Sequence, residues 1–199
     1  MNLDQLVRAI QEELGVNVDC NAGPETWIAI YNRIRPNQSA SPALSEKVDD
    51  RSEKVIATLL PEVQPCARAL VLKAAAAGIR IKVISGLRTY EEQNDLYAQG
   101  RTKPGKIVTN VRGGYSNHNF GIAFDIGVFK GSKYLDESPK YKAVGAMGTD
   151  LGLEWGGNWK SIQDEAHFQL RPKWADDSSE SDMLAELRSR KDSGKAVYV

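Results

Sequence analysis

The stretch SNHNFGIAFD, residues 116–125, carries one of only two histidines in a chain of 199 residues and leads from a loop into an apolar strand. Alternation along this strand places Asp125 on the face opposite to Phe124. Gly121 separates His118 from the strand, and a glycine lets the loop fold its histidine back over the strand end. The stretch therefore predicts an imidazole and a carboxylate beside one another at one strand.

The second histidine lies in AHFQL, residues 166–170, a pattern that is typical of another short strand. There His167 and Gln169 share one face, and Phe168 and Leu170 share the other. Two imidazoles and one carboxylate, with a fourth position open, are the ligand set of a catalytic zinc site rather than a closed structural one. Such a zinc ion lowers the pKa of bound water to about 7 and polarises a carbonyl group.

Hydrolysis by such a water needs a base within hydrogen-bonding reach. Asp164, three residues before His167, is the candidate. Glu165 stays open as an alternative, because on a strand its side chain would share the face of His167. Either histidine taken singly is more simply a surface or satisfied core residue. The two together, both beside carboxylates, favour the metal site.

The composition is that of an ordinary globular domain, with 41% hydrophobic and 26% charged residues. Lys+Arg and Asp+Glu each number 26, so the net charge gives no reason to expect a nucleic acid or membrane partner. No apolar run reaches the roughly 20 residues that span a bilayer. The N-terminus lacks the apolar middle of a secretory signal, and two distant cysteines indicate a reduced, cytosolic site of synthesis.

Helical spacing predicts one helix over residues 3–14 that ends at Gly15, and a second helix that begins at Pro24. Proline and serine then mark a linker. We divide the chain into a small helical module (1–36), the linker (37–48), a main domain (49–175) and an exposed C-terminal helix with a fraying tail (176–199).

Four apolar stretches of the main domain predict strands: RIKVISG, GIAFDIGVF, LEWGG and AHFQL. Helical segments lie between them, and Thr89 with Glu92 forms a capping box that opens one helix. The combination predicts an α+β fold in which helices flank a small antiparallel sheet, with an N-terminal helical extension.

Three blocks resemble, in the same order, the D-alanyl-D-alanine peptidase/hedgehog-like superfamily of zinc peptidases over about residues 80–172. The pattern S-x-H-x-x-G-x-A-x-D over residues 116–125 is similar to the first zinc signature. EWGGNWKSIQDEAHFQL is similar to the second signature. SGLRTYEEQNDLYAQGRTKPGKIVTN is similar to the branch of L-alanyl-D-glutamate endopeptidases, many of them phage endolysins. The resemblance implies that residues 49–175 form a zinc peptidase domain with the fold of that superfamily.

The resemblance implies roles for six residues: zinc ligands at His118, Asp125 and His167, a general base at Asp164, an arginine that holds the substrate and the developing oxyanion at Arg88, and a substrate contact at Ser116. Many relatives have glutamate where Asp164 stands, so its shorter side chain departs from the pattern. From the residues alone, Arg88 could instead form a surface salt bridge with Glu91 or Glu92, and Ser116 could be a plain loop hydroxyl.

The N-terminal segment loosely resembles a peptidoglycan-binding repeat of the type LQ..LG...DG..GP.TW.A. The pattern is kept at Leu6, Gln11, Leu14, Gly15, Asp19, Gly23, Pro24, Thr26 and Trp27. Cys20-Asn21 replaces the usual glycine, and two helices stand where the repeat typically has three. Wall anchoring and a simple packing extension are equal alternatives for residues 1–36.

These features together predict a zinc metallopeptidase that hydrolyses the L-alanyl-D-glutamate bond of peptidoglycan stem peptides and acts as a monomer. A D-alanyl-D-alanine carboxypeptidase and a non-catalytic, zinc-containing wall-binding domain are the alternatives. Asp164 argues against the non-catalytic reading, because a structural zinc needs no base. We expect synthesis in the cytoplasm without a signal peptide, and action on the cell wall after release through a separate pore.

Overall fold

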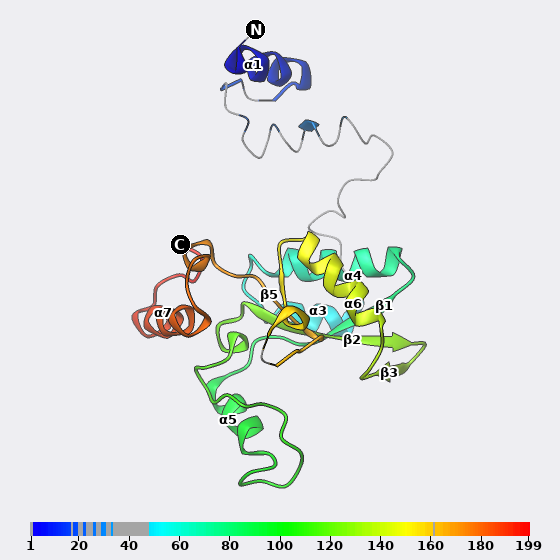
Figure 1. Ribbon diagram of the computed structural model, residues 1–199, viewed down its shortest axis with the longest axis vertical. Coiled ribbons are helices and arrows are strands. Elements are labelled where there is room, and N and C mark those ends of the chain that lie inside the picture. The colour runs from blue at the N-terminus through cyan, green and yellow to red at the C-terminus, as the bar shows by residue number, and fades with distance from the viewer. Residues whose placement is uncertain are drawn as a thin grey trace. The chain divides into compact units, whose positions relative to one another are not determined.

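The structure of the protein, a computed structural model (Figure 1), describes residues 2–16, 18, 19, 22, 26, 29, 30, 33, 48–160 and 162–199. The chain divides into two compact units, Met1–Ala43 and Leu44–Val199. The predicted linker, apart from Val48, and most of the predicted second helix lie outside the described residues. None of the described helices is long and apolar enough to cross a membrane.

Helix α1 (Leu3–Leu14) of the smaller unit forms as predicted, and both of its ends are capped. The side chain of Asn2 accepts a hydrogen bond from the backbone of Gln5, and the side chain of Gln5 accepts one from the backbone of Asn2. Gly15 ends the helix in the left-handed region at φ 67°, which glycine adopts without strain.

The larger unit is built on an antiparallel sheet of five strands: β1 (Arg80–Ser85), β2 (Ala123–Lys130), β3 (Lys133–Leu135), β4 (Glu154–Trp155) and β5 (His167–Gln169). Their order is β1-β2-β5-β4, and β3 pairs with the C-terminal end of β2. The predicted small antiparallel sheet is therefore confirmed, with all four predicted strands. Of the described strands, β3 alone was not predicted, because three residues are too few to carry a periodic pattern.

The register of the strands sets three polar side chains in one row across the sheet. Asp125 of β2 pairs with Ser85 of β1 on one side and with His167 of β5 on the other. Directly paired residues point to the same face of a sheet. The neighbouring pair, Phe124 and Phe168, points to the opposite face, where the two rings stack with centroids 5.8 Å apart.

The main hydrophobic core lies on the Phe124 face of the sheet, between the strands and helices α3 (Asp50–Ile56), α4 (Gln64–Ala76) and α6 (Lys140–Asp150). Its fully buried members come from each of these elements and include Ile56, Leu70, Val83, Ile126 and Val144. Because the helices occupy this face, the row that contains Asp125 is turned away from the core.

Helix α5 (Tyr90–Ala98) begins with the predicted capping box, in which the side chains of Thr89 and Glu92 each accept a backbone hydrogen bond from the other. The long loop after α5 returns along this helix. The buried amide of Gln93 donates to the backbone oxygen of Val111 at 2.9 Å, and Asn94 Oδ1 accepts from the backbone of Gly113 at 2.9 Å. The predicted loop is thus tied to α5 and forms a defined wall.

The C-terminal helix α7 (Glu180–Ser193) is less exposed than predicted. Met183, Leu184 and Leu187 are buried in a second apolar cluster with Phe120 and Ile122. The prediction of a fraying tail is also wrong, because Trp174 Nε1 donates to the backbone oxygen of Val197 at 2.7 Å and Tyr198 OH donates to that of Leu170 at 2.8 Å. These two hydrogen bonds hold the tail against the domain. The charged composition of the C-terminal segment gives no indication of them.

Helix α6 approaches the sheet through glycine. A Cβ atom on Gly145 would lie 2.3 Å from Trp155 Cδ2, and one on Gly148 would lie 2.4 Å from Phe168 Cε1. Contacts this short do not occur between real atoms, so the aromatic rings of β4 and β5 fit only because α6 lacks side chains there. The packing of α6 thereby fixes β5, which begins at His167, and its neighbour β4.

We expect Gly145→Ala to lower the free energy of unfolding by about 1–2 kcal/mol. Overpacking costs about 1–3 kcal/mol, and the clash with the rigid Trp155 ring places this site in the upper half of that range, at about 2–3 kcal/mol, while alanine recovers about 1 kcal/mol of helix propensity relative to glycine. Urea unfolding followed by circular dichroism measures the change. Ala146→Ser, on the exposed side of the same helix, is the control and should change stability by no more than about 0.5 kcal/mol. An unchanged or raised stability of Gly145→Ala would contradict this packing.

Candidate metal centre and active site

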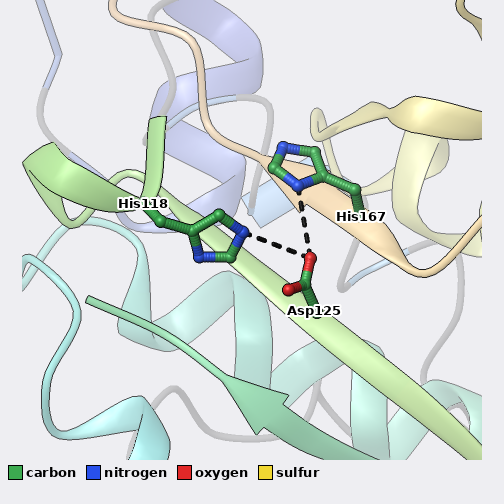
Figure 2. A group of neighbouring side chains, drawn as sticks. All are labelled: His118, Asp125 and His167. Atoms are coloured by element: carbon green, nitrogen blue, oxygen red, sulfur yellow. Dashed lines mark hydrogen bonds and ion pairs between the residues drawn. The ribbon is translucent and has the colours of Figure 1, made fainter. Parts of the chain in front are cut away.

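The structure brings His118, Asp125 and His167 together, although they come from three separate segments (Figure 2). One donor atom from each residue lies within 4.8 Å of the other two. His118 Nε2 and His167 Nδ1 are each 3.2 Å from Asp125 Oδ1. The imidazole rings meet nearly edge to face, with centroids 5.1 Å apart.

His118 reaches this position because the chain reverses directly after it. Residues Asn117–Phe120 form a short 3₁₀ turn, and Gly121 follows in the left-handed region at φ 69°. The backbone oxygen of Gly121 accepts a hydrogen bond from Leu60 at 3.0 Å, which holds the turn against the domain. The predicted function of this glycine, to fold the histidine back over the start of β2, agrees with this geometry.

The hydrogen bonds on the outer side of each ring fix which nitrogen carries the proton. His118 Nδ1 lies 2.7 Å from the backbone oxygen of Gly86, and His167 Nε2 lies 3.0 Å from Gln169 Oε1. A carbonyl oxygen can only accept, so each of these nitrogens must donate its proton. The lone pairs of His118 Nε2 and His167 Nδ1 are therefore directed towards Asp125. Partners of this kind orient histidine ligands in metal sites.

The donor set fits a divalent cation. Two nitrogen lone pairs that face an anionic oxygen at 3.2 Å repel it unless a proton or a metal ion lies between them. Two imidazoles and one carboxylate are also three of the four ligands that a catalytic zinc site requires. The three residues could thus hold one cation and leave a position open towards the cavity.

Charge stabilisation keeps the Asp125 side chain ionised. Burial alone would raise the pKa of Asp125, but when protons occupy the inner ring nitrogens, the charges and hydrogen bonds of His118 and His167 outweigh burial and hold this pKa well below its ordinary value. Burial lowers the pKa of His167, and its hydrogen bond and charge interaction with Asp125 outweigh that effect and raise it. The site therefore presents a carboxylate anion that draws positive charge towards the two imidazoles.

A cavity of about 1000 Å³ opens over the donors. All six residues predicted for the site line this cavity: Arg88, Ser116, His118, Asp125, Asp164 and His167. Glu165, which the sequence left open as a base, is not part of the described lining, and its backbone oxygen accepts from Trp155 Nε1 at 2.9 Å. The structure thereby favours Asp164 over Glu165 as the carboxylate that faces the cavity.

Asp164 is fixed by the turn that precedes β5. Its backbone donates to Gly156 at 3.1 Å and accepts from His167 at 3.2 Å, while Asp164 Oδ1 accepts from the backbone of Ala166 at 3.2 Å. A Cβ atom on Gly156 would lie 2.5 Å from the backbone oxygen of Asp164. The turn can pack this closely only because residue 156 is glycine, and it sets Asp164 beside His167.

Arg88 lies beside the donors and is held from several sides. Its Nη2 is 3.6 Å from Asp125 Oδ2, and its backbone donates to the oxygen of His118 at 3.0 Å. The guanidinium also donates to Ser85 Oγ at 2.9 Å and to Gln93 Oε1 at 2.8 Å. Among the described residues its ion pair is thus with the site, and not the surface bridge that the sequence left as an alternative.

The cavity over the donors is also lined by apolar residues. The ring of Trp159 lies 4.9 Å from the ring of His167, between centroids. The other apolar residues of the lining that are exposed belong to two loops: Val108, Val111, Tyr115 and Ile162. Ser116 lines the same cavity, and its hydroxyl does not cap the turn that follows it. The walls suit a ligand with both polar and apolar groups, as a peptide has.

Sequence reasoning missed two residues that support the site. Gln169 is fully buried and holds His167, and Gln93 is fully buried and holds Arg88. The shared strand face of His167 and Gln169 was a usable signal, since alternation places the amide beside the imidazole. No comparable local pattern points to Gln93.

Comparison with known proteins assigns the chain to a class. Residues 109–170 match the family described as D-alanyl-D-alanine carboxypeptidase. The chain is 39% identical over 124 residues to the peptidoglycan L-alanyl-D-glutamate endopeptidase CwlK of Bacillus subtilis (strain 168). The aligned region covers 57% of this chain and 74% of CwlK. It is 30% identical over 132 residues to the L-alanyl-D-glutamate peptidase of Listeria phage A118, and this alignment covers 62% of this chain and 42% of the phage protein.

A solved structure of Serratia marcescens L-Ala D-Glu endopeptidase ChiX is also similar, at a TM-score of 0.45 and 23% identity over 64% of this chain and 92% of that chain. The match to CwlK spans most of that protein, so the chain belongs to the same family of peptidases. This family is the one described as D-alanyl-D-alanine carboxypeptidase, and it includes L-alanyl-D-glutamate endopeptidases. The resemblance drawn from the sequence motifs is confirmed.

Proposed function

We propose that this protein is a zinc-dependent peptidase that hydrolyses the L-alanyl-D-glutamate bond of peptidoglycan stem peptides at the cell wall, as a monomer. The observation that carries the proposal is the convergence of His118, Asp125 and His167 in the cavity that Asp164 also lines. The identity to CwlK supports this choice of bond.

His118, Asp125 and His167 are the residues that would hold the zinc ion. When bound, zinc supplies a water molecule of lowered pKa and polarises the carbonyl of the scissile amide. Asp164 is the base of the site: its carboxylate accepts the proton of the attacking water and later donates it to the leaving nitrogen. One carboxyl group serves both proton transfers, because it gains a proton from the water in the first and loses that proton to the leaving nitrogen in the second.

Arg88 stabilises the oxygen that becomes negative as the amide carbonyl is attacked. A guanidinium is a planar cation with several N–H donors, and the hydrogen bonds of Arg88 to Ser85 and Gln93 fix it before substrate binds. Removing one such preorganised donor typically costs about 3–4 kcal/mol of transition-state stabilisation. The apolar walls and Ser116 would hold the peptide on either side of the cleaved bond.

Digestion of purified peptidoglycan tests the proposal directly. We expect mass spectrometry to find new N-terminal D-glutamate and glycan strands that retain L-alanine, and a chelator to abolish both products because the donors then lack their cation. Zinc added in excess should restore them. Release of free D-alanine would instead assign the chain as a D-alanyl-D-alanine carboxypeptidase. The absence of any cleavage by the metal-containing protein would favour a wall-binding domain.

We expect Asp164→Asn to lower kcat by about 10²–10⁴-fold, the usual contribution of a general acid–base group, because an amide cannot accept the proton. Zinc content should stay unchanged, since Asp164 is not among the three donors. Glu165→Gln is the matched control, with the same chemical change one residue away, and should retain the unmutated rate. Full activity of Asp164→Asn would exclude this residue as the base.

We further propose that residues 1–36 anchor the enzyme to the wall. Gln11 contacts two other residues that follow the binding-repeat pattern, because its Nε2 donates to Asp19 Oδ1 at 2.7 Å and to Thr26 Oγ1 at 3.0 Å. Gln11 is buried, so these hydrogen bonds join α1 firmly to Asp19 and Thr26. These contacts support a folded binding repeat.

Deletion of residues 1–43, the smaller compact unit, should lower the fraction of enzyme that sediments with purified walls. Cleavage of a small soluble muropeptide should be unchanged, because the donors and the cavity belong to the larger unit. Equal sedimentation of the two proteins would favour a packing extension instead.

A further inference from the structure

Five polar side chains close a hydrogen-bonded ring beside strand β5, here called the Gln169 ring: Asn117, Glu154, Gln169, Arg171 and Glu180. Asn117 Nδ2 donates to Gln169 Oε1 and to Glu180 Oε1, both at 2.5 Å. Gln169 Nε2 donates to Glu154 Oε2 at 2.6 Å. Arg171 joins the two carboxylates, with Nε 2.5 Å from Glu154 Oε1 and Nη2 2.8 Å from Glu180 Oε2.

The direction of every bond in the ring is determined, because carboxylates only accept and a guanidinium only donates. Glu154 takes the amide NH₂ of Gln169, so Gln169 Oε1 must face His167 Nε2, 3.0 Å away. Gln169 is fully buried, and solvent cannot replace either partner if the amide turns over. His167 must then keep its proton on Nε2 and its lone pair on Nδ1.

The ring connects both histidine segments to helix α7, which is distant from them in the sequence but lines the same cavity. Asn117 directly precedes His118, and Gln169 lies two residues after His167. Glu180, the first residue of α7, is 63 positions from Asn117 and closes the ring at both of its carboxylate oxygens. The geometry of the two imidazoles therefore depends on a side chain that makes no contact with either ring among the described hydrogen bonds.

We propose that Gln169 and Glu180 are positioning residues of the metal centre, and that the start of α7 belongs to it. The ring selects the His167 tautomer whose Nδ1 can bind a cation, and Glu180 keeps the amide of Gln169 in the orientation that this requires through Asn117 and Arg171. The inference rests on the proposed metal centre and adds determinants of metal affinity beyond the three donors, in a ring whose members Asn117, Glu154, Arg171 and Glu180 also line the cavity.

A purely structural function of the ring would have different consequences. A tether that only holds α7 against the domain would change the unfolding transition when it is broken. It would leave the proton on His167 Nε2 and the affinity for zinc unchanged in the folded protein. Tautomer and metal affinity, measured on folded full-length protein, therefore separate the two functions.

Zinc affinity is measured by competition with a chromophoric chelator for the unmutated protein, Glu180→Gln and Gln169→Met. Glu186→Gln is the matched control, because Glu186 lies on the same helix and pairs only with Arg190 at 2.9 Å among the described ion pairs. We expect the zinc dissociation constant to rise about 10- to 100-fold for Gln169→Met, as for other outer partners of metal ligands, and about 10-fold for Glu180→Gln. The Glu186→Gln protein should match the unmutated one.

Nitrogen-15 NMR of the metal-free proteins, at a pH where both histidines are neutral, reports the tautomer of His167. We expect the proton on Nε2 in the unmutated protein and in Glu186→Gln, and a mixture of tautomers in the two ring variants. Circular dichroism confirms that each protein is folded, and the half-exposed position of Glu180 makes its variant the milder one. An unchanged tautomer and zinc affinity in Glu180→Gln and Gln169→Met would overturn the inference. An unmutated protein that binds no zinc would instead overturn the proposed function, while the tautomer still tests the ring.

Discussion

Three lone-pair donors held within 4.8 Å of one another, on a sheet face that is turned away from the core, are the constraint on which the larger unit depends. Like-charged or electron-rich atoms at this spacing repel in a region of low dielectric. A folded chain can keep them there only if the surrounding contacts outweigh the repulsion and if a proton or a cation occupies the space between them. The site is thus a preformed receptor for positive charge.

The two faces of one small sheet have different functions: one face packs in the core, and the other carries the polar site. Helices α3, α4 and α6 bury Phe124 and its neighbours on one face, and this burial supplies the stability that the polar face lacks. On the other face, the pairing of Asp125 with His167 fixes the distance between their backbones. Gly86 and Gln169 then orient the imidazoles. Packing therefore sets the position of the ligands, and hydrogen bonds set their orientation.

Much of this arrangement could be predicted from local sequence. Alternation along GIAFDIGVF gave the face of Asp125, and the rarity of histidine identified both imidazoles. The choice between Asp164 and Glu165 could not be made, because it depends on a turn closed by Gly156. The contact of Asn117 with Glu180 was also beyond reach, since it joins residues 63 positions apart and no periodicity encodes such a pair.

X-ray absorption spectroscopy of the zinc-loaded protein tests the central claim most directly, because it counts the atoms around the metal. The account predicts two imidazole nitrogens at about 2.0–2.1 Å and carboxylate or water oxygen at about 2.0–2.2 Å, with no sulfur. Sulfur scattering at about 2.3 Å, or fewer than two imidazoles, would show that the metal binds elsewhere. Either result would contradict the assignment of His118, Asp125 and His167 as the ligands.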